Sequence, residues 1–331
     1  MQNYVNFSVE KAMELLAIPS PTGYTHEAEE YLLREFSALG FEAKRTTKGG
    51  ILVDLGGEDS QNALLLEAHT DTLGGMVAEI KGNGRLRIVN VGGLNANNVE
   101  AENCLVMTKF NGTYEGTLQL CNASLHVNGD YGSTTRKFDV MEVLLDEIVN
   151  SAEEVRALGI EVGDFVCFDP RSKVTDSGYI KSRFLDDKLS VGILFGLAKY
   201  IAEEKPQLSR RIYLHITVYE EVGHGGRPPS PQVLRKPFPW IWAVWVRVCS
   251  APSGRSPSAP RTPAVPTATP WSRSSLPPPR QRVRITLWIF IPTTAPMWKP
   301  PCAQAMTSAT GLSVPVSMPP MATSAVTRTA F

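Results

Sequence analysis

Hydrophobic and polar positions in the first 226 residues follow helical and strand periods in turn. Val9–Ile18 has a helical period behind Ser8, which we expect to cap the helix, and the pattern stops at Pro19. A second helical pattern begins near Thr25 and ends at Gly40. The pattern therefore predicts two helices in this part of the chain.

The next segments are typical of a sheet. Phe41–Thr46 and Ile51–Leu55 are predicted strands joined by a turn, and Ala63–Ala68 is apolar throughout except for Glu67. A continuous apolar run is expected for a strand that is covered on both faces.

From about residue 76 the pattern changes to short alternating segments separated by Gly and Asn, which predicts a small β-rich domain. Beyond it, a helix is predicted over Lys188–Glu204 and a strand over Arg211–Tyr219. We therefore divide the chain into a discontinuous and incomplete α/β domain, an inserted β-rich domain and a tail, which are residues 1–75 with 166–226, 76–165 and 227–331.

Composition separates the tail from the rest. All 33 Asp and Glu lie in residues 1–226, whereas the tail has 12 Lys and Arg, so the tail carries +12 and the body 21 minus 33, or −12. The tail also holds 21 of the 25 prolines and all six tryptophans. Runs such as Ser256–Pro270 cannot form a helix or sheet and bury too little to offset the ordering entropy, so we expect a disordered tail.

A shifted reading frame, caused by a lost nucleotide near codons 226 and 227, explains this tail. Because the Trp codon ends in G and every Ile codon begins with AT, the shifted codon that ends inside Ile241 is GAT, which encodes Asp. Applied to Trp240–Val246, the shift restores the apolar pattern Φ-Asp-Φ-Gly-x-Φ-Gly. Applied to Met318–Thr323, it allows Tyr-Ala-Ser-His-Gly-Tyr.

The five cysteines are odd in number and scattered, which favours a reducing cytoplasm over a disulfide framework. Residues 1–20 lack the apolar core of a signal peptide. No apolar run approaches the roughly 20 residues that a membrane span needs. We therefore expect a cytoplasmic protein that does not associate with membranes.

Three clusters carry the candidate chemistry: His69-Thr70-Asp71, Asp186-Asp187 and Glu220-Glu221. Each lies at the end of a predicted strand or the start of a predicted helix, where open α/β sheets bind their ligands. Taken singly, they could be a structural histidine, a helix cap and solvated charge. Taken together, an imidazole and several carboxylates match a site for two divalent ions, with Zn, Co or Mn suited to these ligands.

The segments HTDTLGG, FLDDKLSVG and EEVGHGG, together with IPSPTGYT, resemble metallopeptidase family forty-two, the glutamyl, deblocking and TET-type aminopeptidases, some of which have been labelled endoglucanases. The resemblance covers residues 1–226. It implies that His69 is a terminal metal ligand with Asp71 as its partner, that Asp186 bridges two metals and that Glu221 binds the second. It also implies that Glu220 is the general base.

The resemblance further implies a doubly wound mixed sheet of the zinc-exopeptidase type, with an inserted β-barrel-like domain and, in this chain, a disrupted C-terminal part. The family completes its site with one more Asp and one more His, which the shifted frame could supply near codons 241 and 321. We expect a peptide substrate, no nucleic-acid partner and, as in intact relatives, a homo-oligomer.

Two alternatives remain open. This polypeptide could be an inactive frameshifted product that lacks two metal ligands. Paired carboxylates could also hydrolyse glycosidic bonds. Adjacent residues of a strand point to opposite faces, however, so Glu220 and Glu221 on a strand could not flank one bond.

Overall fold

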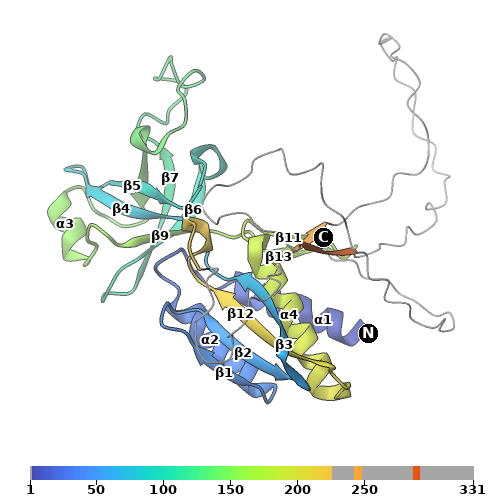
Figure 1. The fold of residues 1–331 in the computed structure, drawn as a ribbon. Helices are drawn as coiled ribbons and strands as arrows, with labels where there is room; N and C mark the ends of the chain where they lie inside the picture. Colours follow the sequence, from blue (N-terminus) through green and yellow to red (C-terminus); the bar gives the residue numbers. More distant parts are fainter. Residues whose placement is uncertain (1, 226–241, 248–285, 291–331) are drawn as a thin grey trace, which may run out of the picture.

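The structure is a computed structural model that describes residues 2–225 together with the backbone of 242–247 and 286–290. It contains an α/β part and a closed barrel, joined by the segments that follow β3 and precede α4 (Figure 1). The chain is thus α/β with an inserted β-barrel body, and the predicted mixed α/β class is confirmed for the described residues.

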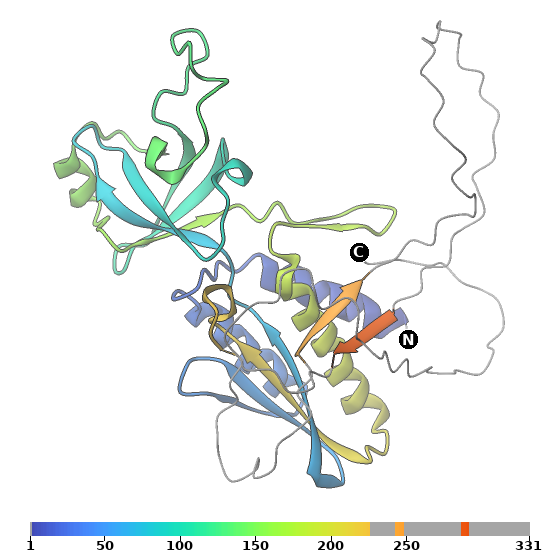
Figure 2. The same cartoon turned by 45° about the horizontal axis from the view of Figure 1, so that its top comes forward.

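The sheet of the α/β part has the strand order β1-β2-β12-β3. β12 runs antiparallel to β2 and parallel to β3, although about 150 residues separate β12 from β3 in the sequence (Figure 2). A parallel pair of this kind needs a long crossover, and here the crossover includes the whole barrel. The strands are β1 (Glu42–Arg45), β2 (Ile51–Gly56), β3 (Asp59–His69) and β12 (Arg210–Thr217).

Three helices pack on one face of this sheet: α1 (Gln2–Leu16), α2 (His26–Ala38) and α4 (Leu185–Glu204). Alternate residues of β2 and β12, such as Val53 and Leu214, point into the core that these helices share. Phe36 of α2 stacks on Phe195 of α4 with ring centroids 4.1 Å apart. The core therefore fixes the position of α4, whose first residues contribute to the candidate site.

Helix α1 begins before the predicted cap, so the predicted start at Val9 is wrong. Ser8 lies inside the helix and packs against α4, where a Cβ added to Gly196 would lie 1.9 Å from the Ser8 hydroxyl. A Cβ added to Gly192 would lie 2.7 Å from the Ser8 carbonyl oxygen. Close packing on the glycines of α4 therefore accounts for the extra turns, which the polar residues of this segment conceal.

The barrel is closed in the order β4-β5-β8-β7-β6-β9, and its interior is filled by apolar side chains. Closure removes the exposed sheet edges that an isolated β domain would present. Short helices lie in its connections: η1 (Ala96–Asn98), η2 (Phe138–Val140) and α3 (Ala152–Ala157). The barrel strands are β4 (Gly74–Ile80), β5 (Leu86–Val91), β6 (Glu102–Met107), β7 (Thr113–Leu120), β8 (Met141–Leu145) and β9 (Phe165–Phe168).

The return from the barrel to α4 contains a small antiparallel pair, β10 (Lys173–Val174) with β11 (Ile180–Lys181). Arg171 and Arg183 from this segment both donate to the carboxylate of Glu102, which is 2% exposed on β6. These ion pairs connect the entry to α4 with the barrel wall.

A buried carboxylate on β8 gives the barrel a pH-dependent contribution to stability. Glu142 is 1% exposed and accepts hydrogen bonds from Lys81 and Arg85. Burial raises the pKa of Glu142, but these two cations outweigh burial and the net pKa is lowered. Because the pKa is lower in the folded chain, the stabilisation is present above the ordinary pKa of about 4.5 and is lost as the pH falls below it.

We therefore expect Glu142→Gln to lower the free energy of unfolding by about 1–3 kcal/mol at neutral pH, because Lys81 and Arg85 then face a neutral amide in place of a carboxylate. The difference from the wild type should shrink between pH 5 and pH 3. Urea unfolding followed by circular dichroism across this range measures it. A difference that stays constant with pH would contradict the assignment of charge to Glu142.

Within the tail, β13 (Trp242–Arg247) and β14 (Thr286–Phe290) form an antiparallel pair, and β13 lies beside β3 and α4. The other residues of 227–331, including Ser256–Pro270 and the positions of the two ligands expected from the shifted frame, lie outside the described residues. Every helix within residues 2–225 falls short of the length or the hydropathy that a membrane-spanning helix requires.

Candidate functional site

The ends of β3 and β12 form the floor of the candidate site. Thr217 of β12 pairs with His69 of β3, and the Thr70 amide donates to the Thr217 carbonyl at 3.0 Å. Parallel pairing therefore brings the residues that follow both strands to the same edge of the sheet. Asp186 reaches this edge from the start of α4, where Asp186 and Asp187 have non-helical backbone angles.

His69 lies at the centre of the predicted residues. Its Nε2 is 3.3 Å from Oδ1 of Asp186 and 3.6 Å from Oε2 of Glu220. The imidazole is 8% exposed, whereas the side chains of Asp186 and Glu220 are 87% and 57% exposed. The site thus has a buried imidazole and carboxylates that reach solvent.

Asp71 is completely buried behind His69 and binds three segments of the chain. Its Oδ2 accepts from the Thr22 hydroxyl at 2.6 Å and from the Glu221 amide at 3.3 Å. Its Oδ1 accepts from the Glu220 amide at 3.3 Å and lies 3.5 Å from Nδ1 of His69. The main-chain carbonyl of Asp71 is closer to that Nδ1, at 3.0 Å.

The charges in the site are unbalanced. Burial lowers the pKa of His69, but the neighbouring carboxylates of Asp186 and Asp71 outweigh it and raise the pKa to about 11. Burial raises the pKa of Glu221 to about 7, and the charges of Asp186 and Glu220 act in the same direction. Several carboxylates therefore share one imidazolium, and a divalent cation binding here would displace its proton.

The donor types fit a divalent metal, because imidazole and carboxylate oxygens are ligands of Zn, Co and Mn. The arrangement is incomplete, however. Within the described part of the chain, no group of three or more His, Cys, Asp or Glu side chains is placed so that it could hold a metal ion. These residues therefore fit a divalent metal by their ligand types and by their convergence on His69.

Glu220 and Glu221 follow the predicted strand, as expected, and do not continue it. β12 ends at Thr217, and the two glutamates lie in a 3-10 turn, η3 (Glu220–Val222), which ends at Gly223 with φ +78°. A left-handed residue is required there, and glycine adopts it without strain. The strand-based argument against glycoside hydrolysis therefore does not apply, although no contact in the described residues favours that chemistry.

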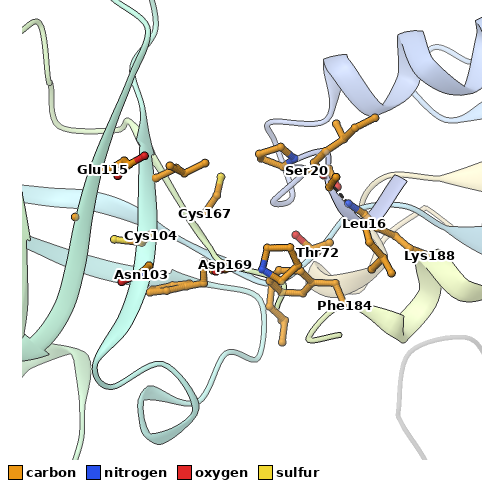
Figure 3. Close-up of a pocket in the computed structure, with 18 of the residues that line it drawn as sticks. Leu16, Ser20, Thr72, Asn103, Cys104, Glu115, Cys167, Asp169, Phe184 and Lys188 are labelled. Carbon is orange, nitrogen blue, oxygen red and sulfur yellow. Dashed lines mark hydrogen bonds between the residues drawn. The ribbon is translucent and has the colours of Figure 1, made fainter. Parts of the chain in front are cut away.

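A cavity of about 340 Å³ lies between the barrel and the α/β part (Figure 3). Ser20, Thr72 and Lys188 line it from the α/β side, and Cys104 and Cys167 line it from the barrel. Lys188 is buried, and its Nζ donates to the Leu15 and Ile18 carbonyls. None of the five predicted site residues lines this cavity, so the candidate chemistry lies outside it.

The sequence reasoning missed two features near the site. Thr22 lies in the segment IPSPTGYT, but the sequence predicts no role for it. His215 is expected to be structural, and the sequence pattern identifies no partner for it. His215 in fact contacts Glu67 across the parallel strands, with Nδ1 and Oε1 2.6 Å apart. The interruption of an apolar strand by Glu67 was the available signal for a buried polar partner.

The family described as M42 glutamyl aminopeptidase matches residues 49–236. YhfE of Bacillus subtilis, which its name assigns to the aminopeptidases, is 43% identical over 228 residues, or 68% of this chain and 66% of its own length. The glutamyl aminopeptidase of Lactococcus lactis is 24% identical over 67% of this chain and 62% of its own length. The chain thus spans less than two thirds of the length of these relatives.

Among solved structures, the TET1 peptidase of Pyrococcus horikoshii is similar, with a TM-score of 0.56 and 26% identity. The similarity covers 65% of this chain and 62% of that one. That peptidase can assemble into a tetrahedron or a large octahedral shell. The match indicates that the two chains share the fold of the α/β part and the barrel.

Proposed function

The chain belongs to the M42 glutamyl aminopeptidase family, and on that premise we propose that it carries the larger part of a metal-dependent aminopeptidase acting on short peptides. The observation that carries the proposal is the convergence of Asp186 and Glu220 on Nε2 of His69, at 3.3 and 3.6 Å. The family resemblance that the motifs predicted supports the same conclusion.

In this proposal His69, Asp186 and Glu221 would hold two divalent ions of Zn, Co or Mn. Such ions, when bound, polarise a peptide carbonyl and acidify water. Glu220 is the general base, because its partly exposed carboxylate can accept a proton from the attacking water and return it to the leaving amine. Asp71 supports the site from behind by accepting the Glu220 and Glu221 amides.

The tail bears on whether this polypeptide is itself active. We propose that residues 227–331 derive from a shifted reading frame, and that the restored frame supplies the two remaining ligands. The family match ends at residue 236, close to the proposed break. The alternative that the chain as it stands is inactive follows directly, because three predicted ligands cannot complete a two-metal site.

A matched pair of proteins tests the proposal: the present chain and a version with one nucleotide restored near codon 226. We expect the restored version to hydrolyse aminoacyl-anilides with added Co or Zn, to lose this activity with a chelator and to regain it with metal. The present chain should show little or no hydrolysis.

A restored protein that binds metal but hydrolyses no aminoacyl-anilide would refute the peptidase assignment. Hydrolysis of cellulose that survives the chelator would instead favour the glycosidase alternative.

Two further expectations belong to the same proposal. Intact relatives point to a homo-oligomer, and the free Cys104, Cys121 and Cys167 suit the predicted reducing cytoplasm.

A further inference from the structure

We propose that Thr22 is a positioning residue for the Glu220–Glu221 turn and acts through the carboxylate of Asp71. The expected effect on kcat rests on the proposed function, whereas the expected effect on the Glu220–Glu221 turn does not. Thr22 lies some 200 residues from the turn in the sequence, between α1 and α2.

The contacts of Asp71 show which of its partners depend on the carboxylate. Nδ1 of His69 lies closer to the main-chain carbonyl of Asp71 than to its carboxylate, at 3.0 against 3.5 Å. The imidazole can therefore be oriented by the backbone alone. The main-chain amides of Glu220 and Glu221, in contrast, both donate to the carboxylate oxygens of Asp71.

The turn that carries the two glutamates needs this support. η3 is a single 3-10 turn, in which Glu220 is exposed and Glu221 is half-buried. Within the turn, the Gly223 amide donates to the Glu220 carbonyl and the His224 amide to the Tyr219 carbonyl. The two bonds to Asp71 therefore connect the turn to the end of β3.

The carboxylate of Asp71 is held by the hydroxyl of Thr22. At 2.6 Å this is its shortest hydrogen bond, and Thr22 is 6% exposed. A hydroxyl donating to a buried carboxylate is a charge-assisted bond, which is about twice as strong as a neutral one. Without it, the carboxylate keeps only longer contacts: the Glu220 and Glu221 amides at 3.3 Å and Nδ1 of His69 at 3.5 Å. Its orientation is then less firmly held.

The backbone around Thr22 is fixed independently of its side chain. Pro21 forms a parallel bridge with Thr72, the Thr22 amide donates to the Thr72 carbonyl, and the Thr72 amide donates to the Ser20 carbonyl. The Ser20 hydroxyl also donates to the Thr70 carbonyl at 2.7 Å. Replacing Thr22 by valine should therefore remove one hydroxyl and leave the segment in place.

The test compares Thr22→Val with Thr22→Ser, which keeps the hydroxyl, and with Thr25→Val as a matched control. Thr25 is 7% exposed and also donates to a carboxylate at 2.6 Å, but its partner is Glu29 on α2, away from the site. Amide hydrogen exchange of Glu220 and Glu221, measured on the full chain, reports the turn directly and requires no activity.

Thr22→Val should speed exchange of these two amides about tenfold or more, because their acceptor is no longer held in place. Thr22→Ser should stay within about threefold of the wild type, and Thr25→Val should lower thermal stability without changing these amides. In the frame-restored version, Thr22→Val should lower kcat by about 10–100-fold with little change in KM.

Exchange at Glu220 and Glu221 that is the same in Thr22→Val and Thr25→Val would overturn the inference. An active enzyme whose kcat is unchanged by Thr22→Val would overturn it as well and leave the peptidase assignment intact. Faster exchange at these amides in a protein without peptidase activity would support the positioning role while removing the proposed function.

Discussion

Glu220→Gln in the frame-restored version is expected to lower kcat for aminoacyl-anilide hydrolysis by about 10²–10⁴-fold, the range that a positioned general base contributes. The variant keeps the size of the side chain and the hydrogen bond from the main-chain amide of residue 220 to Asp71. A glutamine side chain, however, cannot accept a proton from water. Because Glu220 is proposed as a base and not as a ligand, the affinity of the variant protein for Co or Zn should change little.

Two comparison variants separate the roles of the adjacent glutamates. Glu221→Gln should lower metal affinity as well as kcat, since Glu221 is proposed as a ligand. Glu153→Gln, on α3 of the barrel and exposed, should change neither. Metal affinity is measured by calorimetry and kcat with the same preparations. Unchanged kcat in Glu220→Gln would rule out the general-base role, and loss of metal affinity in this variant would make Glu220 a ligand.

The sequence could place the candidate residues at element ends but not in space. His69 and Asp71 follow an apolar strand, and Glu220 follows an alternating one, so local pattern located them near an edge of a sheet. The pattern of neither strand shows that β3 and β12 are neighbours or that they run parallel. It depends on a crossover that contains the barrel, and only the family motifs linked the two segments. The roles of these residues stay predictions.

Other features were decided by packing that no local pattern records. α1 begins at Gln2 and not behind Ser8, because small residues of α4 let the two helices approach closely. The alternating segments after residue 76 indicated a β-rich body, but the order in which its strands close could not be read from their periodicity. The amides of the 3-10 turn at Glu220 donate to Asp71, which is far away in the sequence.

His215→Leu is expected to lower the free energy of unfolding by about 3–5 kcal/mol, because it leaves the carboxylate of Glu67 buried without its partner. The two side chains are 3% and 10% exposed, and they lie at paired positions of β12 and β3. His215 also packs against Gly50, where a Cβ would lie 3.3 Å from Nε2. The imidazole therefore occupies a fixed place on the side of the sheet away from the helices.

Such a loss would lower Tm by roughly 6–20 °C in a chain with about 200 folded residues. The matched control is the double variant Glu67→Leu with His215→Leu, which removes both polar groups and should recover most of the loss, because an apolar pair replaces a buried ionic one. Glu67→Gln should fall between them, since its amide oxygen can still accept from the imidazole.

The double variant distinguishes a lost contact from an unpaired charge. If His215→Leu and the double variant are equally unstable, the cost comes from packing against Gly50 and not from the carboxylate of Glu67. If His215→Leu costs less than about 1 kcal/mol, Glu67 must reach solvent or another donor once the imidazole is gone. Recovery in the double variant assigns the loss to the unpaired, buried charge of Glu67 and not to a net stabilising effect of the pair.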